Sequence, residues 1–193
     1  MSVRLATLDD PLGALTDLIN ESYKIGEKGI FVDTEEFPFL RHTQAEVTAL
    51  VEEKKLLLLI SDDEAVDIIG CVKANGGVEE LDDGSKVGEW GSLAVVEQRW
   101  GHGLGSVLQK AAEEHLAQCG CSVAQLELLT PTHWEHDHKN RLKRWYVDKL
   151  GYQLKTGDYA SSTTRFTEGT MLLKTGQLAC DAEFTIYRRP IGA

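Results

Sequence analysis

Positive charge and long apolar segments are both scarce in this chain. Its 193 residues hold 20 lysines and arginines against 31 aspartates and glutamates, a formal net charge of −11, whereas nucleic acids and anionic lipids bind basic surfaces. No segment approaches the ~18 apolar residues of a membrane span, and residues 1–10 lack the apolar run of a signal peptide. We therefore expect a cytoplasmic protein with no nucleic acid or membrane partner. Its acidity is compatible with a cationic substrate.

Cysteines are few and are not arranged for metal or redox chemistry. The spacing of Cys71, Cys119, Cys121 and Cys180 matches neither a zinc knuckle nor a CxxC pair. The chain contains no HExxH, GxSxG, GxxxxGKS or GxxxxGKT motif. Residues 133–140, HWEHDHKN, hold three histidines, but no distant motif completes a zinc site. We expect reduced thiols, a polar loop at 133–140 and no metal.

Apolar patterns predict the strands of a mixed α/β fold. Val3 and Leu5 alternate in a short first strand, and KLLLLIS at 55–61 has the length of a buried strand. LDDGS at 81–85 predicts an Asp-Gly hairpin turn. Further strands are expected at 67–77, 86–96, 123–131, 152–159 and 181–190.

Helix signals lie between these strands. Asp10 before Pro11 is typical of a helix start, and apolar residues at helical spacing continue to about Tyr23. Thr43 and Glu46 form a capping box for a second helix. A third helix ends near Gly120 and a fourth covers 140–150. The expected inner face of the third helix consists of Val107, Leu108, Ala111, Ala112, Leu116 and Cys119.

The segment QRWGHGLGSVLQK, 98–110, places three glycines between a predicted strand and a predicted helix. A tight turn needs fewer glycines than Gly101, Gly103 and Gly105 supply. The first N–H groups of a helix have no intrahelical partner, and the helix dipole adds partial positive charge there. Glycines would let a phosphate approach these groups. We therefore expect a diphosphate site, although the spacing does not match the GxGxxG of dinucleotide folds.

The wider segment GEWGSLAVVEQRWGHGLGSVLQKAAEEHL, 88–116, resembles the GNAT superfamily of acyl-CoA-dependent N-acetyltransferases. RLATLDD at 4–10 is similar to the first strand of the family, and NRLKRWYVDKLGY at 140–152 is similar to its later helix. The resemblance covers about Val3 to Tyr187 and rests on this combination of motifs.

This resemblance implies a fold and a reaction. The fold would be a single α/β domain over 1–193, with a mixed, mostly antiparallel sheet, a splayed strand pair at the acyl-CoA site and about four helices. The activity would be acetyl transfer from acetyl-CoA, as co-substrate and without a metal, to the primary amine of a small molecule such as an amino acid or polyamine. The amine would attack directly in a ternary complex. The resemblance also allows a homodimer.

The family motif Gln/Arg-x-x-Gly-x-Gly/Ala has its last two positions at Gly103 and Gly105, while Trp100 stands at the Gln/Arg position. Arg99 or His102 would then assist the backbone at the diphosphate. Backbone groups near Leu93 and Val95 would bind the thioester oxygen and the pantetheine, since a bulged strand leaves groups unpaired. The cofactor contacts implied by the resemblance are Leu93, Ala94, Val95, Arg99, Trp100, Gly101, His102, Gly103, Leu104, Gly105, Ser106 and Asn140.

Two residues are implied as catalytic groups. Glu89 lies where some family members have a catalytic glutamate, so it is the candidate base; a solvated strand carboxylate, or an acceptor for a substrate N–H, is the alternative. Tyr146 is the candidate acid for the leaving thiolate, with aromatic packing as the alternative. The common family tyrosine falls on Val147, so Tyr146 can serve only if the helix is locally shifted.

In this family the acceptor pocket is built by the first two helices, their loop and the last hairpin. The matching residues are Tyr23, Glu27 and Phe31, with Tyr159 or Tyr187 as further candidates. Two alternatives stay open: an enzyme that acetylates protein lysines or N-termini, and a silent acyl-CoA-binding module. The displaced tyrosine and Trp100 motivate the second alternative.

Overall fold

The computed structural model describes residues 1–62, 68–173 and 176–192. The chain divides into two compact units. The first contains Met1–Ser22, His42–Ala124 and Pro190–Ala193, and the second contains Tyr23–Arg41 and Gln125–Arg189. Within the described residues no helix combines the length and apolarity that a membrane crossing needs. The four cysteines are all free thiols, as the sequence predicts.

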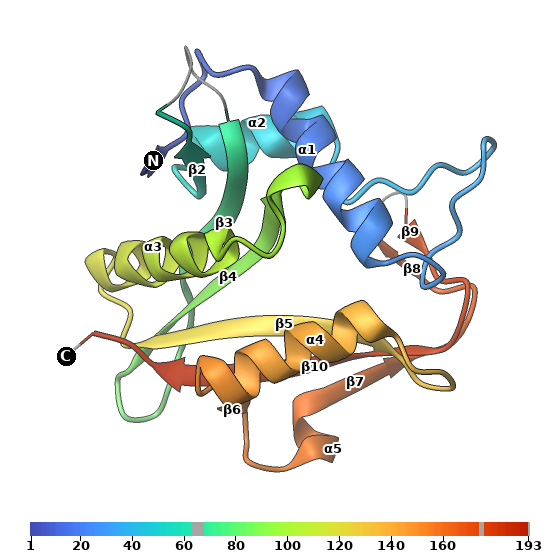
Figure 1. Ribbon diagram of the computed structural model, residues 1–193. Helices are drawn as coiled ribbons and strands as arrows, with labels where there is room; N and C mark the ends of the chain where they lie inside the picture. Colours follow the sequence, from blue (N-terminus) through green and yellow to red (C-terminus); the bar gives the residue numbers. More distant parts are fainter. Residues whose placement is uncertain (63–67, 174–175, 193) are drawn as a thin grey trace. The chain divides into compact units, whose positions relative to one another are not determined.

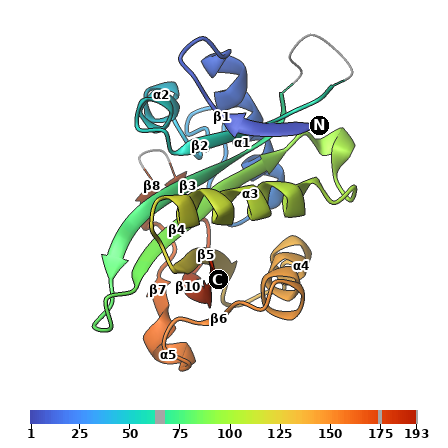
Figure 2. The same ribbon diagram turned by 90° about the vertical axis from the view of Figure 1, so that its left-hand side faces the viewer.

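An antiparallel sheet with strand order β1-β2-β3-β4 forms the first unit. Figures 1 and 2 show these strands in blue to green. All four strands were expected, and β3 extends further than predicted. Leu56, Leu57, Leu58 and Leu59 of β2 are buried, which explains their continuous apolar run. The strands are β1 (Ser2–Leu5), β2 (Leu56–Ile60), β3 (Ile68–Glu80) and β4 (Lys86–Val95).

Helix α3 (Leu104–Gln118) lies along β3 and β4, as the two views of Figures 1 and 2 agree. It packs through Leu108, Ala112 and Leu116, which are fully buried. A Cβ atom at Gly88 of β4 would lie 2.7 Å from Leu116 Cδ2, so glycine is required for this close approach. The predicted inner face was partly wrong, because Val107 and Cys119 are exposed.

Two helices precede β2, α1 (Leu12–Gly26) and α2 (Gln44–Glu52). The capping box at α2 is confirmed, with Glu46 Oε2 accepting from the Thr43 N–H at 2.8 Å. Asp10 does not cap α1. Its carboxylate accepts the Arg4 guanidinium at 2.8 and 2.5 Å and the Thr7 N–H at 2.7 Å, and α1 begins two residues later, at Leu12.

The second unit contains a small sheet around β10 (Ala182–Pro190), which lies next to β5 (Val123–Pro131). β6 (Gln153–Leu154) and β7 (Thr163–Phe166) both pair with β10 in antiparallel register. β8 (Met171–Leu173) and β9 (Gly176–Gln177) form a separate antiparallel pair. The sequence pattern assigns no element to 164–177, of which 174–175 lie outside the described residues, and only two residues of the expected strand 152–159 form a strand.

Helix α4 (Asp137–Arg144) starts before Asn140, its expected first residue, and passes into a π-helical turn, η2 (Trp145–Lys149). Gly151 ends it with φ 74°, as predicted. A short helix, α5 (Tyr159–Ser162), follows. The apolar core of this unit consists of Ile30, Phe31, Phe39, Leu129, Leu178 and Ala182.

Candidate functional site

Strand β4 carries a bulge near its end. Cys71 of β3 pairs with Ala94, but Lys73 pairs with Gly91, so Ser92 and Leu93 together oppose one residue of β3. Ser92 has φ 46°, which is unusual outside glycine, and its Oγ lies 2.8 Å from His42 Nε2. The bulge therefore lies at Ser92 and Leu93, next to the backbone groups that we expect to bind the thioester oxygen and the pantetheine.

The side chains at this end of β4 face the protein interior. Ala94 and Val95 are buried, whereas Leu93 is half-buried. The Val95 carbonyl accepts the Ser22 hydroxyl at 3.2 Å and the Trp100 indole N–H at 2.6 Å. Trp100 is thus folded back onto the strand, while Arg99, in the short helix η1 (Glu97–Arg99), is exposed.

The glycine turn follows η1 and needs glycine at two positions. Gly101 and Gly103 both have φ 79°, a left-handed conformation that costs other residues about 1–2 kcal/mol. His102 Nδ1 lies 3.0 Å from the Trp100 carbonyl oxygen, which closes the turn. Gly105 lies inside α3, so its role is not to allow a positive φ.

The first turn of α3 is open to an anion. Gly103 is its N-cap and supplies no side-chain cap, and this turn contains no acidic residue. The Gly103 carbonyl accepts the Ser106 and Val107 N–H groups at 3.0 and 3.3 Å. The amides of Leu104 and Gly105 belong to the group that a helix cannot satisfy internally. The backbone N–H donors, the helix dipole and the absence of carboxylates in this turn together fit a diphosphate ligand.

Glu89 of β4 forms an ion pair with a neighbouring strand. Its Oε1 accepts Lys73 Nζ at 3.0 Å, and each side chain is 22% exposed. Glu89 is therefore a partly exposed, ion-paired carboxylate, and its role as base stays a prediction. Glu79 and Glu80, at the far end of β3, are exposed.

The π-helical turn η2 supplies the local shift that Tyr146 requires. A π turn inserts one residue and rotates those before it by about 100° relative to those after it. Tyr146 is 7% exposed, whereas Val147 is 37% exposed. Burial, followed by nearby Tyr23 and Glu27, raises the pKa of Tyr146 far above its usual value. Tyr146 therefore stays protonated at neutral pH.

Glu27 is buried near Tyr146. Its Oε1 accepts Lys139 Nζ at 2.7 Å, while its Oε2 has no partner among the described residues. Lys139 is a functional candidate that sequence reasoning missed. Arg41 stacks over the Tyr23 ring at 4.8 Å, so charged groups surround both tyrosines.

These features can be compared with known proteins. The model of the acetyltransferase (GNAT) family matches residues 14–151. The chain belongs to this family. It is a GNAT-type acetyltransferase that uses acetyl-CoA, and no curated protein sequence matches it.

Solved structures show the same fold as this acetyltransferase. The yncA protein of Salmonella typhimurium, with its cofactor acetyl-CoA, is 15% identical, covers 100% of this chain and 95% of its own, and has a TM-score of 0.60. NAA60 of Arabidopsis thaliana, in complex with a bisubstrate analogue, is 14% identical with coverages of 99% and 98% and a TM-score of 0.63. An aminoglycoside 6'-N-acetyltransferase complexed with coenzyme A is 14% identical, covers 100% of this chain and 98% of its own, and has a TM-score of 0.58. At such identity these likenesses concern the fold alone.

Phe31 of the acetyltransferase is a core residue. Its ring is 5% exposed and stacks on Phe39 at 4.5 Å between centroids. It therefore supports the segment after α1 from inside, and in this structure it does not face solvent.

The histidine segment forms no metal cluster within the described residues. His133 Nε2 pairs with Asp181 at 3.1 Å, and His136 stacks on Trp134. Burial lowers the pKa of His138 to about 4, so it is neutral at pH 7. The Asn140 amide donates to Glu135 Oε2, which fixes the side chain at the start of α4.

The acetyltransferase has a polar cavity of about 390 Å³ in its second unit, between α4, β5, β10 and α5. Glu183, Thr185 and Tyr187 of β10 line it, with Lys139 from α4 and Tyr159 from α5. Sequence reasoning missed Glu183 and Thr185. Their alternation along a predicted strand is the signal that could have placed them on one face.

Proposed function

We propose that this chain, as a single domain over 1–193, moves acetyl from acetyl-CoA to the primary amine of a small molecule by direct attack in a ternary complex. The observation that supports this most is the uncapped, acid-free N-terminus of α3, entered through two left-handed glycines directly after a bulged strand. Acetyl-CoA supplies the activated acetyl group.

The proposed cofactor contacts are mostly backbone groups. The amides of Leu104 and Gly105 would hold the diphosphate, with the side chain of Ser106 and the exposed Arg99 as neighbouring contacts. Backbone groups of Leu93, Ala94 and Val95 would hold the pantetheine. Trp100 supports the turn through its bond to Val95, and Asn140 remains a proposed contact.

Glu89 is the proposed base. An alkyl amine has a pKa near ~10.4 and must lose a proton before it attacks. Glu89 Oε1 accepts Lys73 Nζ at 3.0 Å, and the Glu89 side chain is 22% exposed. The carboxylate could take the proton directly or through one water.

Tyr146 is the proposed hydrogen-bond donor to the leaving thiolate. A thiol has a pKa near ~8.5, well below the raised pKa of Tyr146, so full proton transfer from Tyr146 to the thiolate would be uphill. A hydrogen bond that shares the proton requires no such transfer and still stabilises the charge.

The acceptor is proposed to approach the segment that follows α1. Tyr23 and Glu27 are the candidate contacts, with Phe31 holding the segment from within. The long segment 27–41 and the C-terminal extension favour a closed, small-molecule site over an open peptide groove.

Release of free thiol from acetyl-CoA tests the proposal. The acceptors would be L-lysine, spermidine, glucosamine, a lysine-containing peptide and a peptide with a free N-terminus. Turnover on small amines supports the proposal, and turnover on peptides alone identifies a protein acetyltransferase. Calorimetric binding of CoA without turnover on any acceptor indicates a silent module.

A further inference from the structure

One face of β10 is polar where a strand beneath a helix is usually apolar. Glu183, Thr185 and Tyr187 alternate along the strand, and each is less than a tenth exposed. Buried polar groups lower stability unless they are hydrogen-bonded. This face lines the cavity.

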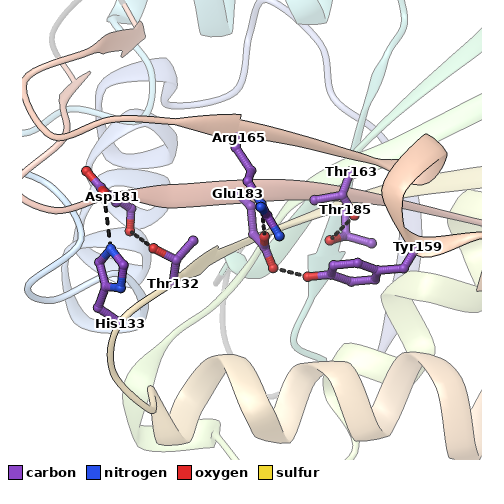
Figure 3. A network of polar contacts seen from close by, with 8 residues as sticks. All are labelled: Thr132, His133, Tyr159, Thr163, Arg165, Asp181, Glu183 and Thr185. Atoms are coloured by element: carbon purple, nitrogen blue, oxygen red, sulfur yellow. Dashed lines mark hydrogen bonds and ion pairs between the residues drawn. The ribbon is translucent and has the colours of Figure 1, made fainter.

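A network of side chains fixes Glu183 in place (Figure 3). The Tyr159 hydroxyl donates to Glu183 Oε1, and Arg165 Nε lies 3.4 Å from Oε2. Thr163 and Thr185 hydroxyls lie 3.1 Å apart beside it. Arg165 is 76% exposed, so its pairing with Glu183 is weak, and Glu183 is the carboxylate that β10 contributes to the cavity.

The opposite wall carries charges of both signs, with the exposed Glu135 as well as two lysines. Lys139, Asn140 and Lys143 of α4 line the cavity. The charge of Lys139 is already balanced by Glu27, whereas Lys143 is exposed and farther along the helix. His136 also lines the cavity, and its Nε2 is buried without a partner in the described chain. Buried polar atoms of this kind are commonly satisfied by a ligand or water.

We propose that this cavity binds a small zwitterion of the amino-acid type, with its ammonium group on Glu183 and its carboxylate on Lys143. The volume is in the range of small-molecule sites. Burial, then Tyr159 and Glu183, raises the pKa of Tyr187 to about 12, so its hydroxyl remains a donor at neutral pH. The proposal is independent of acetyl transfer, because its test needs no acetyl-CoA.

The test is a titration followed by amide chemical shifts in NMR. The probes are L-glutamine, glycine, L-lysine and L-glutamate, with 4-aminobutanamide and 4-carbamoylbutanoate as forms of glutamine that lack the carboxylate or the ammonium group. We expect shifts confined to the cavity residues. Each one-ended compound should bind about tenfold or more weakly than glutamine, the loss of one charged contact.

Variants assign the two contacts. Glu183→Gln and Lys143→Met should each weaken binding about tenfold, while Glu168→Gln and Lys149→Met, exposed and outside the cavity, should not. Lys143 is exposed, so Lys143→Met tests the proposal even if Glu183→Gln does not fold. Absence of shifts with all four amino acids would mean a water-filled cavity, and unchanged binding in Lys143→Met would mean that Lys143 does not hold the carboxylate. Either result would overturn the proposal.

Discussion

The Lys139 ammonium lies 2.7 Å from Glu27 Oε1, and the two side chains are 6% and 5% exposed. The pair joins positions separated by 112 residues. A buried ion pair of this kind rarely stabilises a fold more than apolar residues of the same size, because both charges lose their hydration.

The first prediction follows from that balance. Glu27→Leu or Lys139→Met alone leaves one buried charge unpaired and should lower the free energy of unfolding by about 3–5 kcal/mol. The double variant should recover most of this loss. Urea unfolding measures all three, with Lys143→Met as an exposed control expected within about 0.5 kcal/mol of wild type. Losses that simply add in the double variant would contradict the coupling.

The second prediction separates conformational cost from ligand binding at the glycine turn. Gly103 and Gly84 have φ 79° and 81°, and neither would place a Cβ atom near other atoms. Gly103→Ala and Gly84→Ala should therefore each cost about 1–2 kcal/mol of stability. Only Gly103→Ala should also weaken CoA binding, by about tenfold or more, because it alone adjoins the α3 N-terminus. Equal CoA affinity in both variants by calorimetry would argue against the diphosphate site.

Local signals made much of the first unit predictable. The capping box, the apolar run of β2 and the glycines before α3 each act within a few residues, so the sequence pattern reports them directly. The failures arose where a distant group or a single inserted residue decided the outcome. Asp10 bonds to Arg4 instead of the helix, and Lys139 finds Glu27 across 112 residues. The π turn at Tyr146 has no characteristic amino-acid composition, so the sequence pattern does not indicate it.

A third prediction concerns the Arg4–Asp10 pair. Hydrogen bonds from Arg4 lower the pKa of Asp10 to about 2 from its usual 3.8. A carboxyl group whose pKa is lower in the folded than in the unfolded state stabilises the fold at pH values above its unfolded pKa. This stabilisation is lost as the pH falls from about 4 through about 2. Because the Arg4 side chain is 41% exposed, we expect this stabilisation to add only about 1–2 kcal/mol to the free energy of unfolding. Asp10→Asn should lower stability at pH 7 and flatten its acid dependence. An unchanged acid limb in thermal unfolding would refute the assignment.

A fourth prediction tests the proposed base. Glu89→Gln should lower kcat by about 100-fold or more and remove the acid limb of its pH profile, because no carboxylate is left to accept the proton. Glu80→Gln, on the exposed end of the same hairpin, is the matched control. If Glu89→Gln kept full turnover over the whole pH range, Glu89 would be only the partner of Lys73.

The fifth prediction concerns Tyr146 as a donor. Tyr146→Phe should lower kcat about tenfold, the loss of one hydrogen bond to a charged atom, and leave the KM for acetyl-CoA unchanged. The control is Tyr152→Phe, a buried tyrosine near Arg189.

Because the pKa of Tyr146 is raised, its hydroxyl is protonated below that value and is lost as a donor only above it. Wild-type kcat should therefore show no alkaline fall from this group near pH ~10, where an ordinary tyrosine is half ionised. A fall in kcat near pH ~10 that is present in the wild type and absent in Tyr146→Phe would mean that the hydroxyl is solvated during turnover. The donor role would then require a different geometry.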